Sequence, residues 1–308
     1  LGARFDYISF TEELDISPRM GLKYHLTSTL KFNMAAGRYF QPPFNQYLNS
    51  VRGNPKELRN YYADQVVGGL EFFPSSDSRI TLEYYTKQYA DMVTFEMLKG
   101  SDGRDSLNYY KRINGGEGRS SGLELYIQKK YSNNWYGSFS WSHSISEGID
   151  PRTREYYPWK YDYRNVINLV GGYKIKYKDY DWYGSYKNSM VAKLFSWLPF
   201  MPSDEYQISL KYRYMGGQPY TPKHYDHNIR EWYTNANDEW NTERYGHYIR
   251  IDLMLQQRFH YEKVNLVAFW DIMNILNRKN PYEYMYLGDG TKIMSWQYTT
   301  FPVGGMIL

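Results

Sequence analysis

Apolar and polar residues alternate one by one along much of this chain. The segment WYGSFSWSHSIS (135–146) places two tryptophans, a phenylalanine and an isoleucine on one parity, and five serines on the other. A side-chain period of two is typical of a β-strand with two unlike faces. The pattern recurs in YQISLKYRYM (206–215), HYIRIDLMLQQ (247–257) and SGLELYIQKK (121–130). These stretches predict long strands.

The alternation predicts fourteen strands and almost no helix. We place them at 1–10, 16–25, 28–38, 62–74, 78–98, 119–131, 134–147, 163–177, 204–216, 247–260, 263–276, 281–288, 291–298 and 303–308. Strands of a soluble sandwich usually have about five or six residues. Most of these are nearer ten, the length that crosses a bilayer when the strand is tilted.

The connections between the predicted strands are alternately short and long. Four short turns are expected at 25–28, 74–78, 131–134 and 260–263, and four long polar loops at 39–61, 99–118, 148–162 and 217–246. An outer-membrane barrel has short periplasmic turns and long external loops, so this asymmetry favours a transmembrane antiparallel β-barrel. Residues 178–203 break the rule, and we expect a long periplasmic excursion with one helical turn there.

Composition narrows the function classes. Aromatic residues make up 19% of the 308 residues, with 36 Tyr, 14 Phe and 9 Trp, while the mean hydropathy is −0.73. Tyrosine and tryptophan join an apolar body to a polar tip and suit interfaces. Cysteine is absent, which excludes disulfides and Cys-ligated metals. The net charge of +4 predicts no nucleic-acid partner. The sequence contains no run of about eighteen apolar residues, so it predicts no transmembrane helix.

Five stretches of the sequence resemble the barrel of TonB-dependent outer-membrane receptors. They are SPRMGLKYHLTSTLKFNMAAGRYFQPP (17–43), RSSGLELYIQKKYSNNWYGSFSWSHS (119–144), GHYIRIDLMLQQRF (246–259), FWDIMNILNRKNP (269–281) and FPVGGMIL (301–308). The resemblance implies a 22-stranded barrel in the outer membrane of a Gram-negative bacterium, with lipid around it and a plug domain inside. It also implies coupling to the TonB energy-transducing complex and import of a bulky, scarce nutrient: a siderophore, cobalamin, glycan or peptide.

The sequence departs from that family in two ways. We expect about fourteen strands in residues 1–308, and we expect these residues to supply neither a plug domain nor a TonB-coupling segment. We therefore interpret residues 1–308 as a partial barrel domain, the C-terminal part of a 22-stranded barrel. Two alternatives stay open: a passive diffusion channel made of a complete fourteen-stranded barrel, and a soluble β-rich carbohydrate-binding module.

Candidate ligand-binding residues gather in the longest polar loop. A His pair three apart could bind a metal, but no predicted helix sets the spacing, so we expect neither metal nor cofactor. Aromatic rings stack on sugars and ring-shaped ligands, and external loops capture ligand in the family that the chain resembles. The predicted ligand-contacting residues, which could otherwise be ordinary solvated loop residues, are His224, Tyr225, His227, Trp232, Tyr233 and Trp240.

Four charged residues fall on the polar parity of neighbouring predicted strands: Lys211, Arg213, Arg250 and Asp252. A basic residue at mid-depth on a lipid face would cost about 2–4 kcal/mol, so we expect these residues to face the lumen. There they could pair across strands, contact a plug or contact solute. His143 shares the parity of the tryptophans, an awkward place for lipid. By resemblance, Asp162 and Arg164 match a recurrent membrane re-entry pattern with a structural role.

An enzymatic function is not expected. The nucleophile-elbow pattern G-x-S-x-G does not occur, and the five serines of 138–146 lie on one strand face, where their small size and polarity suit a wet lumen or packing against a plug.

Overall fold

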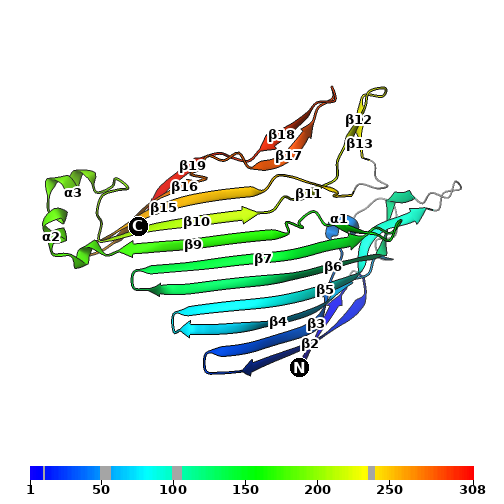
Figure 1. The fold of residues 1–308 in the computed structure, drawn as a ribbon, viewed down its shortest axis with the longest axis horizontal. Coiled ribbons are helices and arrows are strands. Elements are labelled where there is room, and N and C mark those ends of the chain that lie inside the picture. The colour runs from blue at the N-terminus through cyan, green and yellow to red at the C-terminus, as the bar shows by residue number, and fades with distance from the viewer. Residues whose placement is uncertain (10, 49–56, 99–105, 235–239) are drawn as a thin grey trace.

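The computed structural model describes residues 1–9, 11–48, 57–98, 106–234 and 240–308. Its main feature is one curved antiparallel sheet in which strands that follow one another in the chain are paired (Figure 1). In spatial order the strands are β1 (Gly2–Ile8), β2 (Glu13–His25), β3 (Leu30–Gln41), β4 (Tyr61–Ser75), β5 (Ser78–Leu98), β6 (Ser106–Ser132), β7 (Trp135–Ile149), β9 (Asn165–Ile175), β10 (Glu205–Met215), β15 (Tyr248–His260), β16 (Asn265–Met273) and β19 (Phe301–Ile307).

Smaller elements lie at the two ends of the sheet. Short strand β8 (Tyr156–Pro158) pairs with β7, and three two-stranded ribbons lie outside the main sheet. The ribbons are β11 (Pro219–Tyr220) with β14 (Glu243–Arg244), β12 (His224–Asp226) with β13 (Glu231–Tyr233), and β17 (Pro281–Tyr286) with β18 (Lys292–Trp296). The helices are α1 (Asn45–Leu48), the 3-10 turn η2 (Tyr177–Asp179), α2 (Asp181–Lys187) and α3 (Met190–Phe195). No helix in the described parts of the chain is long and apolar enough to cross a membrane.

All fourteen predicted strands are present, but two of them lie outside the main sheet. The strands expected at 281–288 and 291–298 form the separate hairpin β17–β18, not part of the main sheet. The loop expected at 99–118 is also shorter than predicted, because β6 begins at Ser106. Three register irregularities between β5 and β6 interrupt the alternation there, which explains why the pattern failed to predict a strand.

The register aligns like residues across the sheet and gives it two unlike faces. One row, directly paired from β3 to β15, is apolar: Phe32, Leu70, Leu82, Leu125, Trp141, Ile167, Tyr214 and Ile249. The adjacent row is mainly polar: Lys31, Glu71, Thr81, Tyr126, Ser140, Asn168, Arg213 and Arg250. Opposed residues lie on the same face, so the serine parity and the predicted lumen charges share one face, as expected.

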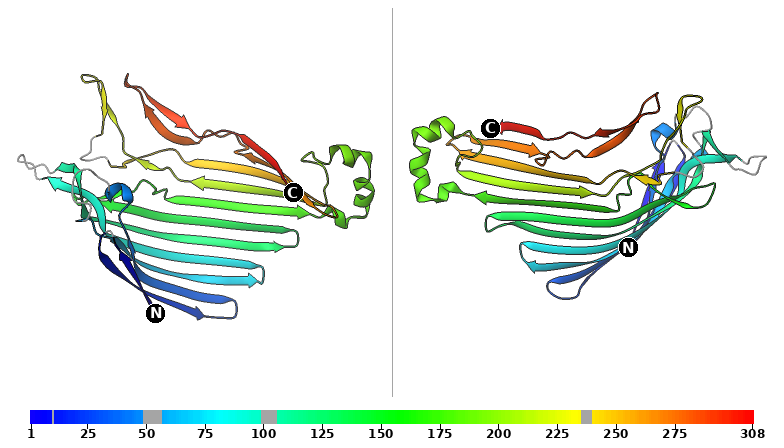
Figure 2. Two further views of the ribbon diagram at one scale, coloured as in Figure 1. Left: turned by 180° about the vertical axis from the view of Figure 1, so that it is seen from behind. Right: turned by 45° about the horizontal axis from the view of Figure 1, so that its top comes forward.

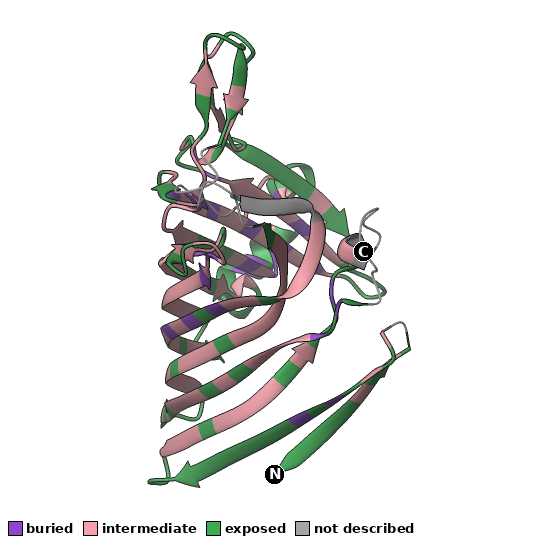
Figure 3. Ribbon diagram, turned by 90° about the vertical axis from the view of Figure 1, so that its right-hand side faces the viewer, coloured by how far each residue is buried: buried purple, intermediate pink, exposed green. Residues whose placement is uncertain are grey.

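The sheet is bent into a trough (Figure 3), and a contact between side chains identifies its polar face as the inner one. On that face Tyr136 of β7 passes over β9 and its hydroxyl lies 3.0 Å from Ser209 Oγ of β10. The path requires Gly172, because a Cβ at that position would lie 2.5 Å from the Tyr136 ring. Side chains of two strands that flank a third strand come within contact distance on the concave side of a sheet, so the face that carries Tyr136 is the inner one. The apolar face, where Leu210 is 43% and Leu169 is 42% exposed, is the outer one.

The short turns and the long loops occupy opposite ends of the trough (Figure 1). We call these the turn end and the loop end. The four predicted short turns join β2 to β3, β4 to β5, β6 to β7 and β15 to β16. The predicted excursion at 178–203 also lies at the turn end, and it holds η2, α2 and α3 where one helical turn was expected. Fully buried polar side chains lie near both ends: Asp162, Asn274 and Asn280 at the loop end, Ser203 and Gln257 at the turn end.

The two faces predict different responses to the same substitution. We expect Leu82→Arg on the outer face to lower the free energy of unfolding by about 2–4 kcal/mol, because the guanidinium must enter lipid. The matched control is Thr81→Arg, one residue away on the inner face of β5, which should cost much less. Denaturant titration of the full-length protein in lipid vesicles measures both. Equal losses would contradict the assignment of the faces.

Candidate ligand site at the loop end

Two hairpins at the loop end pack against each other. Figure 2 shows β12–β13 and β17–β18 rising together from the sheet. Tyr225 Oη donates a hydrogen bond to the Gly288 carbonyl at 2.6 Å, and Trp232 Nε1 donates to the Leu287 carbonyl, also at 2.6 Å. The Trp232 ring meets Tyr286 edge-on, with 4.7 Å between ring centres. Two segments about 60 residues apart in sequence therefore form one unit.

A tyrosine stack continues from this contact toward the sheet. Tyr220 and Tyr245 are stacked with 4.4 Å between ring centres, and Tyr284 lies 5.3 and 5.4 Å from them. Lys292 Nζ lies 3.8 Å from the Tyr284 ring centre, within cation–π range. We call Tyr220, Tyr245, Tyr284, Tyr286 and Trp232 the loop aromatic cluster.

The environment of this cluster raises the pKa of three tyrosines, Tyr220, Tyr245 and Tyr286. Burial raises the pKa of Tyr220 well above its ordinary value, and the nearby Tyr284 and Glu243 raise it further. Burial also raises the pKa of Tyr245 and of Tyr286. A phenol that stays neutral at physiological pH can donate a hydrogen bond as well as stack. The cluster can therefore bind ring-shaped ligands that carry oxygen acceptors.

A pocket of about 500 Å³ opens beside the cluster. It forms where five segments meet, around 160–163, 215–221, 241–248, 281–283 and Gln297. Phenols, amides, glycine backbone and one pair of opposite charges line it. The principal side chains are Lys160, Tyr161, Gln218, Tyr220, Asn241, Tyr245, Tyr282 and Glu283. Such a lining offers many hydrogen bonds and apolar ring surface to a polar ligand.

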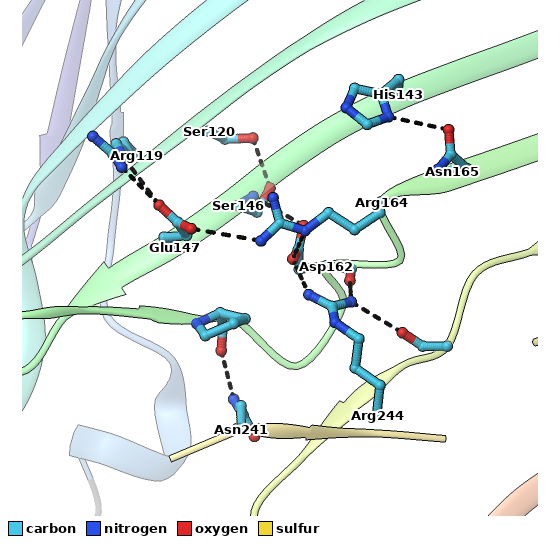
Figure 4. Close-up of polar contacts among 12 residues, drawn as sticks. Arg119, Ser120, His143, Ser146, Glu147, Asp162, Arg164, Asn165, Asn241 and Arg244 are labelled. Atoms are coloured by element: carbon cyan, nitrogen blue, oxygen red, sulfur yellow. Dashed lines mark hydrogen bonds and ion pairs between the residues drawn. The ribbon is translucent and has the colours of Figure 1, made fainter. Parts of the chain in front are cut away.

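A buried carboxylate, Asp162, lies in the chain between Tyr161 and Tyr163, which line this pocket, and it is the centre of a network of polar contacts (Figure 4). Asp162 has a side chain with no exposed surface, and it forms ion pairs with Arg244 at 2.6 Å and Arg164 at 2.9 Å. Its Oδ1 also accepts a hydrogen bond from the Ser146 amide at 3.1 Å. Arg164 adopts a left-handed backbone conformation, with φ of +61°, where the chain turns into β9. Glu147 extends the network, 3.6 Å from Arg164.

This network ties together elements far apart in the chain. Arg244 belongs to β14, at the end of the longest loop, while Asp162 precedes β9. Asn241 Nδ2 also donates to the Pro158 carbonyl at 2.8 Å. These ion pairs and hydrogen bonds are a physical basis for the structural role expected of Asp162 and Arg164. The Asp162 carboxylate fixes the loop that carries the tyrosine stack.

The six predicted ligand residues do not form one site. Tyr225 and Trp232 join the two hairpins, and His227 meets the Tyr225 ring edge-on at 5.0 Å. His224 and Tyr233 face each other across β12–β13, with ring centres 5.7 Å apart. Trp240 packs elsewhere, 5.0 Å from Tyr157 and 4.6 Å below the Arg152 guanidinium. None of the six lines the pocket of about 500 Å³. Within the described ranges, no group of side chains could hold a metal ion.

Sequence reasoning missed the tyrosines that do line the pocket or stack beside it. Tyr284 and Tyr286 belong to PYEYMY (281–286), whose alternation was taken for a membrane strand. Tyr220 and Tyr245 lie at opposite ends of the long loop and meet only because β11 pairs with β14. Their one sequence signal was the density of tyrosine in predicted loops.

The four predicted lumen charges are neighbours on the inner face. Arg250 pairs with Asp252 of its own strand at 2.7 Å, rather than with a neighbouring strand. Asp252 is 7% exposed and also accepts the Asn274 amide at 2.9 Å. Lys211 lies opposite Asp252 in the register, and Arg213 donates to Asn168 Oδ1 at 3.1 Å. His143, on the outer parity, lies at the loop end with Nδ1 3.1 Å from Asn165 Oδ1, so it need not meet the lipid interior.

A curved sheet with an apolar outer face, a polar inner face and elaborated loops at one end defines the wall of an outer-membrane β-barrel. The model of the family "TonB dependent receptor-like, beta-barrel" matches residues 1–275, so the chain belongs to this family. Members of the family are receptors of the Gram-negative outer membrane. No curated protein sequence matches the chain.

Solved structures of the same fold are distant in sequence. The outer membrane transporter YddB from Escherichia coli has a TM-score of 0.63 at 13% identity, over 99% of this chain and 42% of its own. The ferripyoverdine receptor of Pseudomonas aeruginosa has a TM-score of 0.61 at 15% identity, over 95% of this chain and 32% of its own. The ferric yersiniabactin uptake receptor FyuA of Yersinia pestis has a TM-score of 0.60 at 14% identity, over 96% of this chain and 37% of its own. The chain thus spans about a third to two fifths of the length of these proteins.

We predict that Asp162→Asn loosens the attachment of the long loop at Arg244. Two arginines lose a charged partner, and hydrogen bonds to charged groups contribute about 1.5–3 kcal/mol each. The free energy of unfolding should fall by about that amount, and the loop at 217–246 should become easier to cut with protease. Glu117→Gln is the control: it breaks an exposed pair with Arg154, which is worth at most about 1 kcal/mol. The control should leave the protease sensitivity of the loop unchanged.

We also predict that Trp232→Ala separates the two hairpins. The substitution removes the hydrogen bond to Leu287 and the ring contact with Tyr286. Backbone hydrogen exchange at 287–291 should accelerate, while exchange in β7 and β9 stays as it was. Tyr233→Ala, on the same strand but half exposed, serves as the control and should not change exchange at 287–291. Equal acceleration by both variants would argue against the packing described for the hairpins.

Proposed function

We propose that this chain is part of the barrel of an energy-coupled outer-membrane receptor that imports a bulky, scarce nutrient. The observation that carries the proposal is the two-faced curved sheet within a chain of the TonB-dependent receptor family. An apolar outer wall suits lipid, and a polar inner wall suits a hydrated lumen or a plug domain. The proposed partners are outer-membrane lipid, the nutrient ligand and, through another part of the polypeptide, the TonB complex.

The edges of the sheet support a larger barrel. Among the described residues, β1 and β19 each pair along one side only. Unpaired backbone groups facing hydrocarbon cost several kcal/mol each, so a membrane sheet must close on itself. We propose that further strands of the same receptor pair with both edges, and that residues 1–308 make up a partial barrel domain. The chain's coverage of 32–42% of the solved receptors agrees with this proposal.

The loop end would bind the ligand. The pocket and the loop aromatic cluster offer neutral phenols, amides and ring faces at the mouth of the trough. These groups suit a large ligand with many oxygen acceptors, such as a siderophore, cobalamin, glycan or peptide. We propose that Tyr225 and Trp232 support the site by joining the hairpins. His224, His227, Tyr233 and Trp240, outside the pocket, would add ligand contacts at its rim.

Uptake by cells that produce the full-length protein tests the function. Radiolabelled ferric siderophores, cobalamin, oligosaccharides and peptides are the probes. We expect uptake of one class only, lost when an uncoupler collapses the proton gradient or when TonB is deleted. We also expect no steady conductance from the purified protein in planar bilayers. Uptake that survives the uncoupler, together with steady conductance, would overturn the proposal in favour of a passive channel. Recovery in the soluble fraction would favour the carbohydrate-binding module.

The binding site has its own test. Tyr284→Ala removes the centre of the tyrosine stack and should weaken binding of the imported probe at least tenfold, since an aromatic contact and its burial together amount to about 1.4 kcal/mol or more. The control Tyr131→Ala alters an exposed tyrosine at the turn end and should leave binding unchanged. Unchanged affinity in the Tyr284 variant would place the ligand elsewhere.

A further inference from the structure

The excursion at the turn end lies against the outer wall of the sheet. Its segment 198–201 is hydrogen-bonded to two outward-facing residues, Tyr206 of β10 and Gln257 of β15, and the register places Ala268 of β16 in the same row. These three side chains are 7%, 0% and 1% exposed. Ile208, the next residue of β10 that faces outward, is 40% exposed. A segment that hung free below the barrel, or inside it, would not bury residues of the outer face.

Hydrogen bonds fix this position. Gln257 Nε2 donates to the Leu198 carbonyl at 3.0 Å and to the Met201 carbonyl at 2.6 Å. Tyr206 Oη donates to the Pro199 carbonyl at 2.6 Å. A glutamine on an otherwise apolar face would be costly in lipid, and here its amide is used to hold the backbone of the excursion.

The helices are attached to the ends of the strands by a second set of contacts. Lys187, the last residue of α2, forms an ion pair with Asp204 at 2.8 Å, and Asp204 also accepts the His260 amide at 2.7 Å. Tyr183 is buried and its ring is stacked on Tyr177, with 6.3 Å between centres. The excursion is therefore a fixed part of the barrel rim.

Large apolar side chains nevertheless point away from the protein along this rim. Met190 is 76%, Leu194 57%, Trp197 55% and Phe200 82% exposed. Only Ala192 of α3 is buried. We call Met190, Leu194, Trp197 and Phe200 the foot. An exposed apolar group of this kind is costly in water and marks a surface that contacts an apolar phase or a partner.

We propose that the foot inserts into the phospholipid leaflet on the periplasmic side of the outer membrane. The proposal rests on the membrane orientation in the proposed function. Continuity with the lipid-facing wall supports it, because segment 198–201 is hydrogen-bonded to residues of that wall, and α2 and α3 lie just beyond the ends of β9 and β10 (Figure 1). Its composition also fits the membrane boundary. Tryptophan and tyrosine favour that zone, and the exposed Lys193 of α3 can approach lipid phosphates.

The foot would fix the depth and tilt of the barrel at this side. Short turns with polar tips leave the strand ends free to shift along the membrane normal. A rigid apolar group beside the wall, seated about 5–10 Å into the headgroup boundary, resists that shift. The attachment through Asp204, Tyr206 and Gln257 would pass the resistance to β10 and β15.

Site-directed labelling of the full-length protein in phospholipid vesicles tests the proposal. The chain has no cysteine, so Phe200→Cys can be labelled with an environment-sensitive fluorophore once any cysteine elsewhere is replaced by serine. Leu210→Cys on the outer wall is the lipid-embedded reference, and Ser76→Cys at a short turn is the water-exposed reference. All three are exposed positions, so folding should be retained.

We expect Phe200→Cys to show a blue-shifted emission, close to that of Leu210→Cys, and to be quenched best by nitroxides near the lipid headgroup. A Phe200 label as water-exposed as that at Ser76 would overturn the foot, leaving its apolar surface for a protein partner. If the Leu210 label were also in water, the membrane barrel itself would be wrong, so the two failures are distinguishable. Leu194→Cys repeats the measurement in case labelling at Phe200 disturbs the segment.

Discussion

Backbone hydrogen bonding between neighbouring strands is the constraint on which this structure depends. Lipid offers no partner for a peptide N–H or C=O, so each strand must be paired along its length. Once the pairs form, the register decides which side chains share a face, and a shift by one residue would reverse both faces. Leu82, Leu125 and Trp141 lie in one row because the register makes them partners. The two environments of the barrel follow from that alignment.

Polar side chains are buried where the regular pairing stops. At the loop end Asp162, Asn274 and Asn280 are nearly inaccessible, and each bonds to backbone or to charged groups of another segment. At the turn end Gln257 bonds to the backbone of the excursion in the same way. A barrel wall has no dry core to organise its loops, so buried hydrogen bonds and ion pairs take that task. The loop aromatic cluster is positioned by these contacts.

The sequence was a good guide to the sheet and a poor guide to the site. Side-chain period and the spacing of turns are local properties, so they predicted most strands to within a few residues, with the start of β6 as the exception. The site depends on contacts between segments far apart: Tyr220 meets Tyr245 and Tyr284, and Trp232 meets Tyr286. Alternation could not distinguish the hairpin β17–β18 from a membrane strand, because both alternate. The four inner-face charges were predicted to share a face, since that follows from parity alone.

The alternation of inward and outward residues has an exception at the turn end. By parity Tyr206 and Gln257 face lipid, yet the structure buries both. A glutamine at an outward position would be unfavourable in a bare barrel wall, and the excursion supplies two carbonyl groups that accept hydrogen bonds from its Nε2. The polar residue and the long connection thus explain each other: each would be out of place without its partner. A polar residue that breaks the outward pattern beside an unusually long turn is therefore a sequence sign that the turn folds back onto the wall.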